Sequence, residues 1–224
     1  MTPYPLDRAR DAFVQEYELL GDLLAGLTDE QLLLPSRCHG WAVCDVVCHL
    51  HLGLQELLCG FSVPAGRPAD TGFATYWRHE QPGGSPPLTY TRFVRLVAGA
   101  YSRPGRLVTH LRPTLDAVLA QTRRAAPDDV WSFQGCAIPA ADLIATWVVE
   151  AAVHHLDVTL HLPAAPPPAA PALAVVRETA EALGLPPMPW DDVTLALRAT
   201  GREPLDDADR VLLGPAAALV PVLG

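Results

Sequence analysis

The 224-residue chain is acidic and half apolar, which places it among globular proteins. Apolar residues make up 50% of the sequence, and 16 basic against 25 acidic residues give a formal net charge of −9. This apolar content suffices for a sizeable core and excludes a disordered chain. The basic residues are scattered and no apolar run approaches the length of a membrane span, so we expect neither nucleic acid nor a membrane as a partner.

The cysteines and the N-terminal segment indicate a reducing compartment. Five cysteines are an odd number in a chain long enough to build its own core, which argues against a disulfide framework. The N-terminus carries Asp7, Arg8, Arg10 and Asp11 where a signal peptide would be apolar, so we expect a cytoplasmic protein. Arginine is the only strongly basic residue, lysine and asparagine are absent, and alanine and proline are abundant, as in proteins of GC-rich genomes such as those of actinobacteria.

Apolar residues that recur every three or four positions predict four long helical segments. These segments are 5–27, 41–60, 89–126 with a break near Pro104, and 139–161. Thr28 and Gln31 resemble a capping box for a short helical turn after the first segment. The stretch 62–87 is rich in proline and glycine and is expected to be a long loop of the kind that often has a function.

Four long amphipathic segments predict an all-α fold, a bundle over residues 1–163 with a small C-terminal α/β appendage over 164–224. The appendage is expected to begin with a proline-rich linker over 164–171 and a further helix over 172–183. A strand of alternating pattern over 193–199 and a tail over 205–224 are expected to follow. Metal and cofactor ligands of helical bundles project from facing helices into the core. Polar residues at inward positions are therefore the candidates for function.

The fourth helical segment places an acid and an imidazole on its inward stripe. Glu150 and His154 are one turn apart, and Trp147 and Asp157 fall in the same sector. Such a pair is costly to bury without partners. It could ligate a metal ion together with a third ligand from a facing helix and leave open coordination positions, as catalytic zinc sites do. It could also be a hydrogen-bonded pair in the core, which is the commoner arrangement, and the pattern leaves both interpretations open.

The second helical segment offers histidines on two different flanks. Cys44, Cys48 and His51 share one flank, where they could form a Cys/His metal site or simply pack as small buried side chains. His49 lies on the other flank. Periodicity alone slightly favours His51 over His49 as a ligand.

Three segments of the chain resemble DinB-like proteins of the mycothiol-dependent maleylpyruvate isomerase type. The string GWAVCDVVCHL at 40–50 resembles the motif that opens the second helix of these proteins, and ATWVVEAAVHHLD at 145–157 resembles their fourth-helix motif. TGREPL at 200–205 is similar to the C-terminal segment of actinobacterial members. The resemblance implies a DinB-like four-helix bundle.

The resemblance also implies a divalent metal, typically zinc, held by a histidine of the second helix and by a glutamate and a histidine of the fourth. At the matching positions these residues are His49, Glu150 and His154. Two departures stand out. Ala42 occupies a position where relatives usually have threonine or serine, so a side-chain N-cap worth about 1 kcal/mol is missing. The part after the linker is also shorter than in the isomerase, where it carries some of the substrate-binding groups.

Four further residues are candidates for holding the metal ligands in place or for binding substrate around such a metal. Asp157 could orient a metal-bound histidine or make a helix-end hydrogen bond. Trp147 could wall a substrate pocket or fill the core, and Arg202 could bind an anionic group or lie solvated on the surface. His155 points to the neighbouring face and is expected to be a structural or rim residue rather than a ligand.

Three protein ligands leave room for a thiol sulfur, and a bound dication converts a thiol that is mostly protonated at neutral pH into a thiolate. We therefore expect a metal-dependent transferase that uses a low-molecular-weight thiol, mycothiol by the resemblance, as cosubstrate. The thiolate would attack a small electrophilic substrate beneath the 62–87 loop, in detoxification or natural-product biosynthesis. The shorter C-terminal part favours transfer over maleylpyruvate-type isomerisation.

Three alternatives remain open besides the transferase. One is the mycothiol-dependent isomerase itself. Another is a metal-dependent hydrolase, in which the same ligands activate water. The last is a non-catalytic protein that binds a small molecule in the bundle, with Glu150 and His154 as a hydrogen-bonded pair. A homodimer is compatible with all of them.

Overall fold

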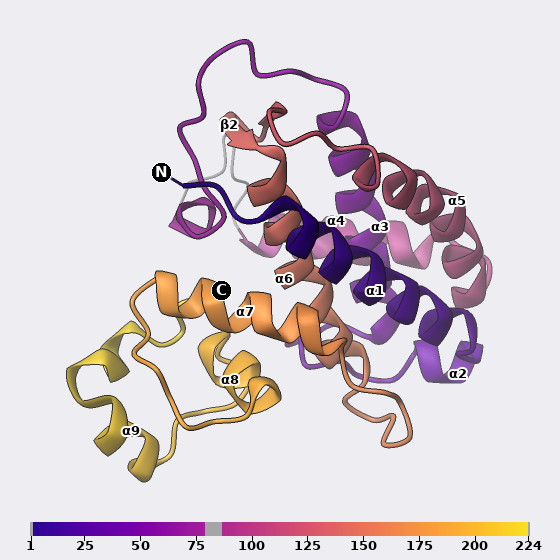
Figure 1. Ribbon diagram of the computed structural model, residues 1–224. Coiled ribbons are helices and arrows are strands. Elements are labelled where there is room, and N and C mark those ends of the chain that lie inside the picture. Colours follow the sequence, from indigo (N-terminus) through magenta and orange to yellow (C-terminus); the bar gives the residue numbers. More distant parts are fainter. Residues whose placement is uncertain (1, 79–86, 224) are drawn as a thin grey trace.

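The computed structural model describes residues 2–78 and 87–223 (Figure 1). Within these residues the chain is mostly helical, with a single two-stranded sheet. The predicted all-α class is therefore confirmed. No helix in the described part of the chain combines the length and the apolar character that crossing a membrane would require.

The four longest helices make up what we call the helical core. They are α1 (Leu6–Ala25), α3 (Val43–Gly60), α5 (Pro104–Thr122) and α6 (Ala140–Val158). Helices α1 and α3 each contact both α5 and α6, so the four helices close a ring around a common apolar interior. Each lies within a segment that apolar periodicity predicts.

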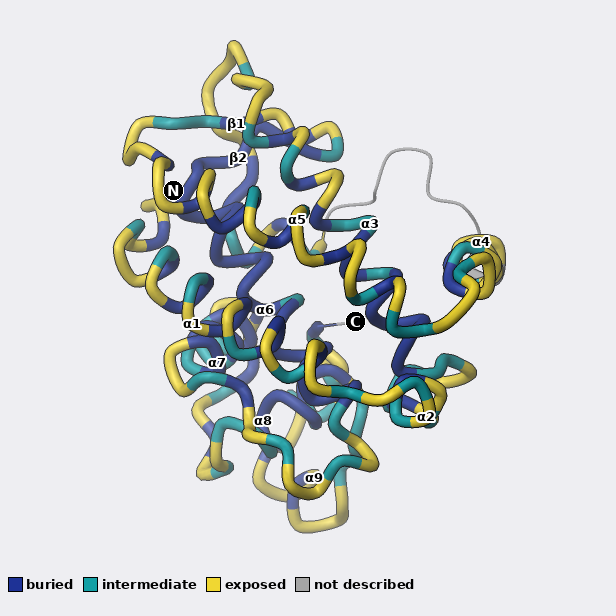
Figure 2. Tube along the Cα trace, turned by 90° about the vertical axis from the view of Figure 1, so that its right-hand side faces the viewer, coloured by how far each residue is buried: buried dark blue, intermediate teal, exposed yellow. Residues whose placement is uncertain are grey.

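Helix α6 is the most deeply buried element of the helical core, and its tube is almost entirely dark blue in Figure 2. Of its 19 residues, only Glu150 is not buried. Small residues such as Ala151 and Ala152 let the neighbouring helices approach closely. On the side of α3, a Cβ atom at Gly53 would lie only 2.6 Å from Cη2 of Trp147. The close contact between α3 and α6 thus depends on that glycine.

The start of α3 shows how the missing N-cap is compensated. Ala42 provides no side-chain cap. Instead, the carboxylate of Asp45 accepts a hydrogen bond of 2.9 Å from the Ala42 backbone N–H. A β-bridge between Pro35 and Ala42 holds the preceding loop closed. This hydrogen bond is one of the two that make up a capping box, and it fixes the first turns of α3, which carry His49.

The shorter elements before α6 agree in part with the sequence predictions. Helix α2 (Asp29–Leu32) is capped by Thr28 and Gln31 as predicted, and the third helical segment is broken into α4 (Pro87–Gly99) and α5. The predicted 62–87 loop is held against the sheet by backbone hydrogen bonds and includes a 3-10 turn at Thr75–Arg78. Residues 79–86 of that loop lie outside the described residues.

The sheet is a hairpin that the sequence patterns did not reveal. Strands β1 (Val130–Phe133) and β2 (Cys136–Pro139) pair antiparallel directly before α6. Gln134 and Gly135 connect them with positive φ angles of 47° and 83°, as a tight two-residue hairpin turn requires. The Gln-Gly pair at 134–135, between two short strand-forming segments, was the feature of the sequence that could have indicated this hairpin.

The regular elements of the C-terminal part are all helices among its described residues, so the strand predicted over 193–199 is wrong. It contains α7 (Ala170–Ala182), α8 (Asp192–Ala199), α9 (Asp207–Leu213) and a 3-10 turn (Gly214–Leu219). Asp191 caps α8 by accepting a hydrogen bond from the Thr194 N–H. This cap, together with the buried Ala196 and Ala199, outweighs the alternating apolar pattern. The predicted appendage is thus α rather than α/β.

Helix α7 packs against α1 and α6, and α8 packs against α7 and α6 (Figure 1). The C-terminal part therefore covers the end of α6 that carries His154. The boundary at residues 163 and 164 between the bundle and the appendage stays a prediction.

Candidate metal centre

Helices α3 and α6 bring His49, Glu150 and His154 to one point. The Nε2 atom of His154 lies 3.2 Å from Oε2 of Glu150, and Nε2 of His49 lies 3.8 Å from the same oxygen. One ligand atom from each of the three side chains lies within 4.8 Å of the other two. The imidazole rings meet edge to face, with their centroids 4.8 Å apart. One side chain of α3 and two of α6, about a hundred positions away in the sequence, can therefore share one cation.

These three side chains line a cavity of about 220 Å³. The cavity is completed by Trp77, Val149, Val153, Thr200, Arg202 and Leu223. The side chains of His49 and Glu150 are 25% and 27% exposed, whereas that of His154 is 9% exposed. A small molecule in the cavity can thus reach the point where the three ligand atoms meet.

The carboxyl group of Glu150 is suited to binding a cation. Burial by itself would raise its pKa, but the neighbouring imidazoles of His154 and His49 outweigh that effect and hold the pKa below its ordinary value. Glu150 is therefore ionised at neutral pH and offers a negatively charged oxygen between the two imidazoles.

His154 is oriented from behind by a buried ion pair. Its Nδ1 atom lies 2.8 Å from Oδ2 of Asp157, whose side chain is fully buried. Arg202 donates to the same carboxylate from Nε at 2.8 Å and from Nη2 at 2.9 Å. Because a carboxylate only accepts hydrogen bonds, Asp157 keeps a proton on Nδ1 and directs Nε2 toward Glu150. Burial lowers the pKa of His154, but Asp157, Cys38 and Glu150 together raise it, so a cation would replace the Nε2 proton.

The second imidazole, His49, has a different outer partner. Its Nδ1 atom lies 2.8 Å from the hydroxyl of Tyr90 on α4. Burial, followed by the charge of Glu150, raises the pKa of Tyr90 to about 12, so this phenol is neutral. A neutral phenol can both donate and accept, and it therefore accommodates either tautomer of His49. Sequence reasoning missed Tyr90, because nothing in its local pattern points to α3.

Cys38 is a second residue that sequence reasoning missed. Its thiol donates to Oδ2 of Asp157 over 3.1 Å and lies 4.0 Å from Nδ1 of His154. Cys38, His154 and Asp157 form a second group of side chains close enough to hold a metal ion. Both oxygens of Asp157 already accept from Arg202, which makes this group a poorer site for a cation than the first. Cys38 lies in the loop before α3, where helical periodicity gives no signal.

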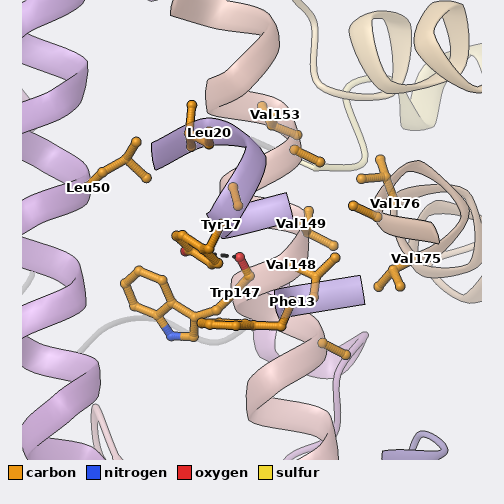
Figure 3. Close-up of a cluster of buried hydrophobic side chains, with 14 of the residues drawn as sticks. Phe13, Tyr17, Leu20, Leu50, Trp147, Val148, Val149, Val153, Val175 and Val176 are labelled. Carbon is orange, nitrogen blue, oxygen red and sulfur yellow. Dashed lines mark hydrogen bonds between the residues drawn. The ribbon is translucent and has the colours of Figure 1, made fainter. Parts of the chain in front are cut away.

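Two of the four further candidates lie away from the cavity. For His155 this agrees with the expected structural role, and for Trp147 it selects the core over the pocket wall. His155 points toward α1, where Nδ1 lies 2.8 Å from Oε1 of Glu16 and Nε2 lies 3.0 Å from the Pro166 carbonyl oxygen. Trp147 belongs to the apolar core, where its ring meets that of Phe133 edge to face. Figure 3 shows it among the buried side chains of α1 and α6. Neither His155 nor Trp147 lines the cavity.

The remaining two predicted outer residues do lie at the site. Asp157 contacts His154, and Arg202 lines the cavity while it holds Asp157. In contrast, Cys44, Cys48 and His51 do not form a metal-ligating group among the described residues. The ring of His51 instead meets that of His110 at a centroid distance of 4.6 Å.

A helical core that presents a carboxylate and two imidazoles to one partly exposed cavity defines a helical protein with a candidate metal centre. The chain belongs to the mycothiol maleylpyruvate isomerase N-terminal domain family, whose model matches residues 13–159. This range includes His49, Glu150 and His154 but not Arg202. The family is a mycothiol-related enzyme family, as the resemblance of the helix motifs predicts. No curated protein and no solved structure is detectably similar to the chain.

Proposed function

We propose that the protein is a metal-dependent transferase that uses a low-molecular-weight thiol, mycothiol, as nucleophile on a small electrophilic substrate. The observation that carries this proposal is the convergence of His49, Glu150 and His154 within 4.8 Å at a cavity of about 220 Å³. Membership of the family supports mycothiol as the thiol. We place the reaction in the cytoplasm, where such thiols are reduced, in detoxification or natural-product biosynthesis.

The donor set fits a divalent metal ion. Two imidazole nitrogens and one carboxylate oxygen are ligands that zinc accepts, and three protein ligands leave a coordination position open. His49, Glu150 and His154 would hold the ion, while Asp157 keeps the His154 ring in place. When bound, the ion would favour the thiolate form of a thiol whose ordinary pKa is about 8.5. The apolar side chains Val149, Val153 and Leu223 would shield the reacting carbon from water.

Residues 1–163 supply the three ligands, and we propose that residues 164–224 form an appended part that completes the site. Arg202 is the link between the two, because it pairs with Asp157 at the end of α6. A mycothiol-dependent isomerase is the second candidate, favoured by the name of the family. Both reactions would begin with addition of the thiolate sulfur to one carbon of an electrophilic double bond, and the displaced π electron pair would take up a proton at the neighbouring atom. They differ only in whether the thiol stays on the product or is expelled again.

Metal analysis of untagged protein, reconstituted with Zn²⁺ and then dialysed, tests the metal site. Wild-type protein should retain zinc in stoichiometric amount, and His49→Ala should lose it while its helical circular dichroism is kept. His51→Ala is the matched control, since His51 lies on the same helix but outside the ligand group, and it should retain zinc. Loss of zinc from His51→Ala but not from His49→Ala would contradict the proposed ligands.

A second measurement separates the proposed reaction from its alternatives. The zinc-loaded protein is incubated with electrophiles in the presence and absence of mycothiol, and the products are identified by mass spectrometry. A thiol adduct formed only with enzyme and thiol supports transfer, and an isomer of the substrate supports isomerisation. Consumption of the electrophile without thiol would indicate a hydrolase. Protein that retains no zinc after reconstitution would contradict all three enzymatic functions.

A further inference from the structure

We infer that the cavity beside His49, Glu150 and His154 accepts an uncharged, largely apolar electrophile of about the size of one ring, rather than an anionic one. This inference rests on the proposed function for the reaction and on the cavity wall for the substrate. The wall outside the three ligands is formed mainly by Trp77, Val149, Val153 and Leu223. Contact with such a wall favours apolar groups, because it removes them from water.

The size of the cavity limits the substrate to a small molecule. At about 220 Å³, the cavity is larger than a cavity of about 150 Å³ that binds benzene. It is smaller than the ~300–1,000 Å³ of pockets that take drug-sized ligands. One ring with a short substituent therefore fits the available space.

The charged side chains of the wall are not free to bind a substrate anion. Among the described residues that line the cavity, Arg202 is the only arginine. Its Nε and Nη2 donate to Asp157, and its Nη1 donates to the Thr200 carbonyl oxygen at 3.2 Å. Turning Arg202 toward a substrate would leave the fully buried Asp157 carboxylate without its counter-ion, which is costly. The two N–H groups with which an arginine side chain binds a carboxylate are thus already donated to Asp157.

The other polar groups of the wall lead to the same conclusion. The hydroxyl of Thr200 donates to the Ala196 carbonyl oxygen over 2.6 Å and is engaged within α8. Glu150 contributes one negative charge, so a dication and a thiolate bound beside it would sum to zero charge. The indole Nε1 of Trp77 is buried without a hydrogen-bond partner among the described residues, so the wall offers one neutral donor. A substrate carboxylate would exchange its hydration for this single donor and keep an uncompensated charge, whereas one donor suffices for a neutral carbonyl group.

A matched pair of unreactive probes tests this inference by binding alone. The probes are 3-nitrobenzamide and 3-nitrobenzoate, which share one ring and nearly one size but differ by a negative charge. Isothermal titration calorimetry is performed on the full chain with Zn²⁺ and saturating mycothiol, so that the benzoate gains nothing by ligating the metal. We expect the benzamide to bind at least about tenfold more tightly, a difference of about 1.4 kcal/mol. Equal or tighter binding of the benzoate, or binding of neither probe, would overturn the inference.

The variant Arg202→Lys provides a second comparison, because it keeps the positive charge beside Asp157 and removes the planar guanidinium. If Arg202 serves Asp157 and not the substrate, the ratio of the two probe affinities should stay the same in the variant, even where the zinc affinity falls. A selective loss of benzoate binding in Arg202→Lys would show that the guanidinium binds substrate anions and would overturn the inference.

The probe measurement is repeated on metal-free protein, which distinguishes failure of the inference from failure of the proposed function. Protein that does not retain zinc defeats the proposed function, yet it still reports the charge preference of the cavity. Protein that retains zinc and mycothiol but prefers the benzoate defeats only the inference about the substrate.

Discussion

Helix α6 carries two adjacent histidines that each pair with an acid on a different face, and the difference between the two pairs separates a structural pair from a candidate ligand pair. His154 pairs with Glu150 at the cavity, and the adjacent His155 pairs with Glu16 of α1. The side chains of Glu16 and His155 are both 0% exposed, whereas those of Glu150 and His154 are 27% and 9% exposed. The same residue types therefore occupy a closed site on one face and an open site on the other.

The hydrogen-bond partners explain this difference better than the residue types do. Both ring nitrogens of His155 are engaged, and the second oxygen of Glu16 accepts from the Ala169 N–H at 2.6 Å. Nothing in that pair is left for a ligand. His154, in contrast, uses Nδ1 for Asp157 and turns Nε2 to the cavity side, where Glu150 and His49 meet it. In a metal site, one ring nitrogen of a histidine ligates the metal while the other donates its N–H to a buried partner, and His154 is arranged in this way.

The largest effect is expected from breaking the closed pair. Glu16→Ala leaves His155 and the Ala169 N–H without their buried partner, which should lower the free energy of unfolding by about 3–5 kcal/mol. Urea unfolding measures this change. Glu18→Ala is the control, since Glu18 lies on the same helix in an exposed pair with Arg123 worth about 0–1 kcal/mol. A loss in Glu16→Ala no greater than that of the control would contradict the structural role of the closed pair.

The next largest effect is expected from the outer partner of the open pair. Asp157→Asn removes the charge that holds the Nδ1 proton of His154 and that pairs with Arg202, so the zinc affinity should fall about 10- to 100-fold. Competition with a chromophoric chelator measures the affinity. Asp142→Asn serves as control, because Asp142 is a buried carboxylate of the same helix that accepts from the Tyr4 N–H, away from the cavity. An unchanged affinity in Asp157→Asn would mean that the buried ion pair does not support the metal site.

A smaller effect is expected at the other imidazole. Tyr90→Phe removes a neutral hydrogen bond worth about 0.5–1.5 kcal/mol, and water can replace the phenol because His49 is 25% exposed. The zinc affinity should therefore fall less than in Asp157→Asn, measured by the same competition. Tyr101→Phe is the matched control, since Tyr101 makes the same kind of bond, 2.7 Å long, to His110 outside the site. A loss in Tyr90→Phe as large as in Asp157→Asn would show that both imidazoles depend equally on their outer partners.

The smallest effect is expected at the start of α3. Ala42→Ser supplies the missing N-cap and should raise the free energy of unfolding by about 0.5 kcal/mol, at the low end for caps, because Asp45 already satisfies the Ala42 N–H. Urea unfolding measures the gain, and the zinc affinity should be unchanged. A destabilised variant would indicate that the Ala42 site has no room for the serine hydroxyl.

The sequence predicts the helices of the core well, because their apolar residues repeat over four or more turns. It also predicts Glu150 and His154, which stand out as polar residues on the inward stripe of α6. It does not by itself choose His49 over His51, since α3 is buried around most of its circumference and the direction of its apolar side is poorly defined. Only the resemblance of the helix motif selects His49.

The residues that sequence reasoning missed or misplaced depend on contacts between distant segments. Cys38 and Tyr90 reach the site from a loop and from α4, and the partner of His155 is Glu16, more than a hundred positions away. Periodicity describes one helix at a time, so it cannot show such contacts. The false strand at 193–199 has a local cause, because the Asp191 cap was a helix signal that outweighs the alternation of apolar residues.

The central claim is that His49, Glu150 and His154 hold a divalent ion with a position open to an external thiol. Substituting Co²⁺ in wild-type protein and in Cys38→Ser, and recording absorption before and after addition of mycothiol, tests it most directly. We predict a thiolate-to-cobalt charge-transfer band that appears only after mycothiol is added and is equal in both proteins. A band present before mycothiol and absent in Cys38→Ser would place the ion at Cys38, His154 and Asp157 and contradict the account.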